Sequence, residues 1–157
     1  MLNPPFQRRS ATSADIAFLI ALRQSTMQAH FENAGLPYER ETQRERVLAD
    51  FGWAEIILCD GTPIGLVKLD KGDNPWHLHQ IQLMPTMQGR GIGSRLMGDL
   101  LAEAAREGVA IELKVLKGNP AKGLYQRLGF VMVEERHHSF RLLWQPALPN
   151  RQDPIKK

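Results

Sequence analysis

The chain has 157 residues, of which 43% are hydrophobic and 24% are charged, and its formal net charge is +3 at pH 7. This composition predicts one globular domain with a sizeable core, and the mild charge does not indicate a nucleic-acid-binding protein. We expect no membrane span and no secretory leader, because no apolar run is long enough for either. The single cysteine, Cys59, excludes an internal disulfide and favours a cytoplasmic location.

The first half of the chain predicts one strand, two helices and then three strands. A short strand at residues 6–9 comes first. Either Ser13 or Thr12 can then cap a helix whose apolar residues repeat at helical spacing over residues 14–29. A second, highly charged helix follows at residues 38–50. Apolar runs bounded by turn residues then predict three strands, at residues 53–59, 63–69 and 76–83.

The second half predicts a long helix at residues 91–107, in which Gly98 is expected to allow close packing on a sheet. The elements after it are a strand, a short helix and two antiparallel strands, at residues 110–117, 120–128, 130–136 and 139–144. Prolines after residue 144 predict a disordered tail at residues 145–157. This order predicts a single α/β (α+β) domain over residues 1–144, with a mixed sheet rather than a doubly wound one.

A glycine-rich stretch, Gln88-Gly89-Arg90-Gly91-Ile92-Gly93-Ser94, lies where an apolar strand meets the long helix. Glycines let backbone N–H groups converge, and a helix N-terminus that follows them favours phosphate. The spacing fits neither the G-x-G-x-x-G dinucleotide fingerprint nor the nucleoside-triphosphate loop. A tight turn without a ligand and a nucleotide-binding oxidoreductase remain alternatives. The pattern Q-x-x-G-x-G, preceded by Leu83-Met84-Pro85, resembles the acetyl-CoA-binding motif of the GNAT N-acetyltransferase superfamily.

A second stretch, from Asn119-Pro120-Ala121 to Gly129-Phe130, resembles the other recurrent signature of the same superfamily, in which an L-Y-x-x-x-G-F segment follows an Asn and an Ala. The same residues also fit a short helix that begins at a capping Asn119 and ends at Gly129. The resemblance covers about residues 6–144. It implies the GNAT fold, with six to seven mostly antiparallel strands and about four helices.

The resemblance implies acetyl-CoA as the acetyl donor, direct attack of an amine on the thioester, and no metal. Tyr125 falls at the superfamily's general-acid position, although its hydroxyl could instead bond the backbone. Asn119 could bind the cofactor arm or only cap the helix. The residues that the resemblance places at coenzyme A are Leu83, Met84, Gln88, Gly89, Arg90, Gly91, Ile92, Gly93, Ser94 and Asn119.

His77 and His79 are candidates for the base that deprotonates the amine. Alternation along a strand would place both on one face, a short distance before Leu83. The arylalkylamine N-acetyltransferase branch has a His-x-His pair at this offset, which implies proton removal through water, and imidazole titrates near neutral pH. Two polar residues on a half-exposed strand are the alternative interpretation.

The resemblance places the acceptor between residues 26–40 and 134–140. The candidates for one side are Met27, His30, Phe31, Glu32, Tyr38 and Glu39, and those for the other are Glu134, Glu135, His137 and His138. Carboxylates there would attract a cationic amine. We expect a primary amine as acceptor, a small molecule rather than a protein, with no nucleic-acid or membrane partner and a possible homodimer. The alternative is a non-catalytic acyl-CoA-binding or sensing module on the same fold.

Overall fold

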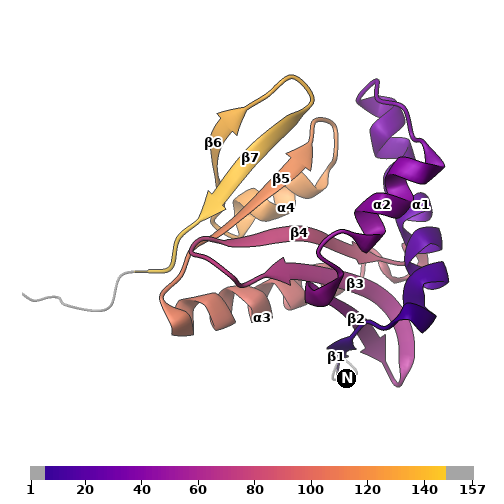
Figure 1. Cartoon of the computed structure of the whole chain (residues 1–157). Coiled ribbons are helices and arrows are strands. Elements are labelled where there is room, and N and C mark those ends of the chain that lie inside the picture. The colour runs from indigo at the N-terminus through magenta and orange to yellow at the C-terminus, as the bar shows by residue number, and fades with distance from the viewer. Residues whose placement is uncertain (1–5, 148–157) are drawn as a thin grey trace, which may run out of the picture.

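The computed structural model describes residues 6–147, which form one seven-stranded sheet with helices on both faces (Figure 1). The strand order across the sheet is β1-β2-β3-β4-β5-β7-β6, and every neighbouring pair is antiparallel except β4 with β5. The strands are β1 (Phe6–Ser10), β2 (Ala54–Cys59), β3 (Thr62–Asp70), β4 (Trp76–Leu83), β5 (Ile111–Leu116), β6 (Val131–Glu135) and β7 (Ser139–Trp144).

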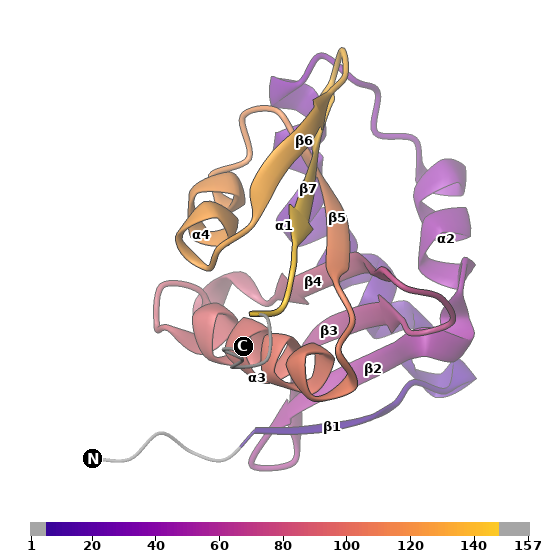
Figure 2. The same ribbon diagram turned by 90° about the vertical axis from the view of Figure 1, so that its left-hand side faces the viewer.

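Two helices cover each face of the sheet, as Figures 1 and 2 show together. One face carries α1 (Ile16–Asn33) and α2 (Arg40–Leu48), which pack on β2 and β3 over a smaller apolar cluster. The other carries α3 (Ile92–Glu107) and α4 (Ala121–Arg127) over the larger core. Short 3₁₀ helices occur at Ser13–Asp15, Phe51–Trp53 and Pro85–Met87.

The predicted fold class, a mixed sheet of six to seven strands with about four helices, is confirmed by the observed seven strands and four α-helices. The hairpin turn between β2 and β3 is built as its sequence indicates, because Asp60 and Gly61 both have positive φ, as a primed two-residue turn requires. Most of the predicted tail, residues 148–157, lies outside the described residues. Within residues 6–147, no helix is both long and apolar enough to cross a membrane.

Lys68 joins β3 to the end of α2 from a fully buried position. Its ammonium donates to the backbone carbonyls of Arg46, Val47 and Ala49 at 3.0, 3.1 and 2.6 Å. These carbonyls lie at the C-terminal end of α2, where no further helical amide is available to them. Burial lowers the pKa of Lys68 to about 8. The lysine therefore fixes α2 against the sheet beside β4.

Gly65 and Gly98 differ in whether the surrounding structure leaves room for a side chain. A Cβ on Gly65, in β3, would lie 2.4 Å from the carbonyl oxygen of Gln82 in β4, so only glycine allows these strands to approach. Gly98 in α3 is exposed, and a Cβ there would meet no atom within 4 Å. The expectation that Gly98 allows close packing on the sheet is therefore wrong.

We predict opposite effects of alanine at these two positions. Gly65→Ala should lower the free energy of unfolding by about 2 kcal/mol, because a strand of the central sheet must move. Gly98→Ala should raise it by about 1 kcal/mol, because alanine is the better helix former. Chemical denaturation measures both values. A neutral Gly65→Ala would show that the approach of β3 and β4 is looser than described.

Candidate active site

The sheet opens between its two parallel strands. β4 and β5 pair over only three residues each, ending at Leu78 and Leu113, and then diverge (Figure 1). Beyond Leu78 the β5-facing edge of β4 has no strand partner. Two cavities lie along this opening, and both are lined by Ile81 of β4 and Tyr125 of α4. The opening therefore has two compartments with a shared wall.

The first compartment, which we call the glycine-side cavity, has a volume of about 530 Å³ and lies at the start of α3. Gly89 and Gly91 adopt left-handed φ values of 75° and 78°, which glycine adopts without strain, and α3 begins directly after Gly91. The side chain of Gln88 donates to the carbonyl of Leu83 at 3.0 Å, which ties this loop to the end of β4. The amides at the start of a helix favour an anion.

The structure brings six of the ten predicted cofactor residues to this cavity. They are Leu83, Gln88, Gly89, Gly91, Gly93 and Ser94. The other four do not line it, for reasons that the local structure gives. Met84 packs beneath α1 and donates its amide to the carbonyl of Ile64, and Ile92 is buried in the larger core. Arg90 is exposed.

Asn119, the fourth, caps α4. Its Oδ1 accepts a hydrogen bond from the amide of Ala121 at 2.9 Å, and the residue lines the other cavity. The capping alternative is therefore present in the structure, and a contact with the cofactor arm stays a prediction.

Sequence reasoning missed part of the glycine-side cavity. Met97 and Leu124 form part of its apolar wall. Among the described residues, Arg127 is the one arginine that lines this cavity. Arg127 lies two residues after Tyr125 at the end of α4, one face of which turns toward the cavity. The position of this helix opposite the glycine loop is a tertiary feature, so no local pattern marks Arg127.

Tyr125 is 9% exposed and packs against Phe130, with ring centres 5.7 Å apart. Burial raises the pKa of its phenol to about 12. Within residues 6–147 its hydroxyl forms no hydrogen bond, so the backbone-bonded alternative is not what the structure shows. The phenol is a protonated donor at neutral pH at the boundary between the two cavities.

The second compartment, the histidine-side cavity, has a volume of about 380 Å³ and runs from β4 to α1 and α2. Met27, Phe31 and His138 line it as expected. The predicted acidic residues do not: Glu134 pairs with Arg136 and Arg141, and Glu135 pairs with Lys117. The expectation that these glutamates line the acceptor site is therefore not met.

His77 and His79 both line the histidine-side cavity, with ring centres 4.4 Å apart. Their proximity does not follow from simple alternation. Lys68 pairs with Gln80 and Leu69 with Leu78, so His79 has no partner on β3 and forms a β-bulge. His77 lies 3.6 Å from a carboxylate oxygen of Glu112. The sequence placed both histidines at one site but did not reveal the bulge.

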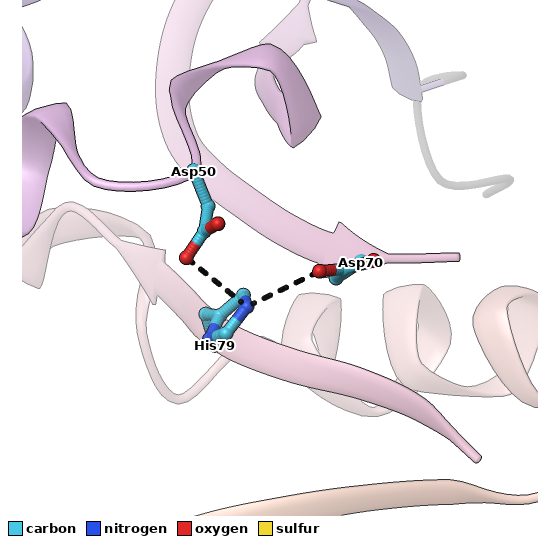
Figure 3. Close-up of side chains that lie close together, drawn as sticks. All are labelled: Asp50, Asp70 and His79. Carbon is cyan, nitrogen blue, oxygen red and sulfur yellow. Dashed lines mark ion pairs between the residues drawn. The ribbon is translucent and has the colours of Figure 1, made fainter. Parts of the chain in front are cut away.

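Two carboxylates from distant parts of the chain flank His79 (Figure 3). Its Nε2 lies 3.4 Å from Asp50, which follows α2, and 3.9 Å from Asp70 at the end of β3. Burial and the neighbouring His77 lower the pKa of His79, and the two aspartates oppose this without cancelling it. His79 is therefore mainly neutral at pH 7 and able to accept a proton.

Comparisons with known proteins agree with this geometry. Residues 17–130 match the acetyltransferase (GNAT) family. The chain is 37% identical over 98 residues to N-alpha-acetyltransferase RimI of Mycobacterium tuberculosis, covering 59% of this chain and 61% of that protein. It is 36% identical over 64 residues to ribosomal protein bS18-alanine N-acetyltransferase of Haemophilus influenzae, covering 40% and 44%. The matches thus span less than two thirds of either relative.

Solved structures share the fold. The PaiA N-acetyltransferase of Thermoplasma acidophilum, in complex with coenzyme A, aligns with a TM-score of 0.73 at 19% identity, covering 90% of this chain and 99% of that one. The ribosomal-protein-S18-alanine N-acetyltransferase of Escherichia coli aligns with a TM-score of 0.69 at 16% identity, covering 92% and 96%.

We predict that His79 titrates below the ordinary value for histidine when followed by NMR. Asp50→Asn should lower its pKa further, because a carboxylate that favours imidazolium is removed. His77→Ala should raise the pKa, because a like charge is removed. Asp60→Asn, on the exposed hairpin turn, is the control and should leave the pKa unchanged. An increase with Asp50→Asn would contradict the described contact.

Proposed function

Because the chain belongs to the GNAT acetyltransferase family, we propose that it transfers an acetyl group from acetyl-CoA to the amine of a second substrate. The observation that carries this proposal is the pair of cavities that meet at Ile81 and Tyr125. The glycine-side cavity suits a phosphate-bearing donor, and the histidine-side cavity contains His79 as a candidate base. Tyr125, the candidate acid, lines both cavities. Bound acetyl-CoA supplies the activated acetyl thioester.

The glycine-side cavity fits coenzyme A by its chemistry. Left-handed glycines and the first amides of α3 present N–H groups that suit a pyrophosphate, and Arg127 adds a positive charge. Leu83 and Met97 provide apolar wall for the thioester arm. Past Leu78, the unpaired edge of β4 offers backbone groups to which an extended amide-containing arm can bond as an added strand would.

Tyr125 is proposed as the general acid that protonates the leaving thiolate. Its raised pKa keeps the phenol protonated at neutral pH, and the hydroxyl is not engaged by any described residue. Burial disfavours the leaving thiolate as well as the phenolate, so the phenol stays a protonated donor until the thiolate forms beside it. Its place on the shared wall lets it act without blocking the acceptor.

His79 is the better of the two predicted bases. Its lowered pKa leaves it neutral at pH 7, and Asp50 and Asp70 stabilise the imidazolium that forms when it takes a proton. His77 lies beside it and can pass a proton on through contact or water. The amine must lose a proton because only its free electron pair attacks the thioester.

The acceptor that we propose is the α-amine of a polypeptide rather than a small molecule. The names of the two sequence relatives, an N-alpha-acetyltransferase and a ribosomal-protein alanine N-acetyltransferase, support this choice. They do not support the small amine expected from the sequence. The alternative of a non-catalytic acyl-CoA-binding module predicts binding of acetyl-CoA with no product.

Tyr125→Phe should reduce kcat for peptide acetylation by about 100-fold or more, because a general acid is removed. The dissociation constant of acetyl-CoA, measured by calorimetry, should change little, since the ring and its packing remain. Tyr38→Phe is the matched control: Tyr38 lines neither cavity and contacts Phe31. Unchanged kcat in Tyr125→Phe would remove the general-acid role, and binding without turnover in the parent would favour the non-catalytic module.

A further inference from the structure

Arg23 is a charged residue that the proposed reaction does not use. It projects from α1, is only 4% exposed, and lines the histidine-side cavity. Its Nε donates to Oε1 of Gln43 at 2.6 Å. Among residues 6–147, no carboxylate lies within ion-pair distance of its guanidinium. A cation taken out of water in this way costs free energy unless an anion compensates it.

The remainder of the cavity does not supply that anion. Its other cationic side chains are Arg46, Lys68 and Lys114, whereas Asp50 is its one carboxylate among the described residues and lies beside His79. Lys68 is already bonded to three backbone carbonyls. The cavity is therefore electropositive on the side of Arg23, and this potential attracts an anionic ligand.

The geometry leaves one end of Arg23 available. Gln43 occupies Nε, so the two Nη groups remain to form the paired hydrogen bonds that a guanidinium makes with a carboxylate. The Phe31 ring helps to hold the charge in place, because the guanidinium carbons of Arg23 and Arg46 lie 5.9 and 6.0 Å from its centre. Burial and the charge of Arg46 lower the pKa of Arg23 to about 10, which still leaves it a cation.

Arg23 and Tyr125 approach the cavity from opposite faces of the sheet, on α1 and α4. We infer that the acceptor carries a carboxylate close to its reacting amine, and that Arg23 binds this carboxylate while the amine faces Ile81 and Tyr125. This inference rests on the proposed acetyl transfer. In the proposed polypeptide acceptor this carboxylate belongs to an acidic side chain near the N-terminus. The α-carboxylate of a free amino acid has the same chemistry, and the test below distinguishes the two sources.

This specificity reverses the expectation from the sequence. Acidic residues were expected to attract a cationic amine, but the pocket that the chain builds presents cations instead. A simple polyamine would meet repulsion from Arg23 and Arg46. An acceptor with a compensating carboxylate would be both attracted and oriented, because a two-point contact fixes the direction of its amine.

Two matched pairs of acceptors test the inference with the wild-type protein. The pair Ala-Glu-Ala amide and Ala-Gln-Ala amide differs in a side-chain carboxylate, and the pair alanine and alaninamide differs in the α-carboxylate. With acetyl-CoA as donor, kcat/KM should favour the anionic member of at least one pair by about tenfold or more, mainly through KM. The pair that shows the preference identifies the source of the carboxylate.

Variants assign the preference to Arg23. Arg23→Met should bring the anionic-to-neutral ratio of kcat/KM close to one. Arg44→Met is the matched control, because Arg44 is an exposed arginine of α2 that lines neither cavity. The double variant Arg23→Met with Gln43→Leu replaces both hydrogen-bonding partners, and provides a folded alternative if the single variant is unstable.

Equal kcat/KM within both pairs would overturn the inference and leave the proposed function intact. A preference that survives in a folded Arg23 variant would also overturn it. If the wild-type protein acetylates no acceptor, the proposed function fails, and calorimetry with coenzyme A present then decides the carboxylate site. Binding of N-acetylalanine or acetyl-Ala-Glu-Ala amide that is lost in Arg23→Met would support the site, and absence of binding would refute it.

Discussion

The opening between β4 and β5 is the constraint on which the site depends. β4 pairs with β3 along its length and β5 pairs with β7 along its length, but β4 and β5 share only three residue pairs. Since a buried sheet normally pairs its backbone groups throughout, this gap has to be compensated by something other than a strand. Coenzyme A on one side and an acceptor on the other would fill it. The same gap places Ile81 and Tyr125 at a common wall.

Much of the fold could be predicted because the signals are local, and the predicted donor residues also lie in local motifs. The glycines at positions 89, 91 and 93 lie together in one short segment of the sequence, and each strand has its own apolar run. Tyr125 belongs to a motif of the same kind, and its catalytic role stays a prediction. The family and the fold class, both predicted from these patterns, are confirmed.

The features that could not be predicted from the sequence depend on contacts between residues far apart in the chain. Asp50 and Asp70 meet His79 through a turn, a strand end and a bulge that no spacing rule connects. Arg23 is one of 20 lysines and arginines, and only its burial on α1 separates it from a solvated charge. Gly98 was misjudged because an exposed helical glycine and a packed one look alike in sequence. Homodimerisation stays a prediction.

We propose that donor and acceptor occupy separate compartments and meet between Ile81 and Tyr125. A crystal structure with a bisubstrate analogue tests this arrangement directly, if an acetyl bridge joins the sulfur of coenzyme A to the α-amine of a short acidic peptide. We predict the phosphates at residues 88–94, the bridging carbonyl beside Tyr125, and the peptide in the histidine-side cavity. Coenzyme A in the histidine-side cavity, or both halves of the analogue in one compartment, would contradict the claim.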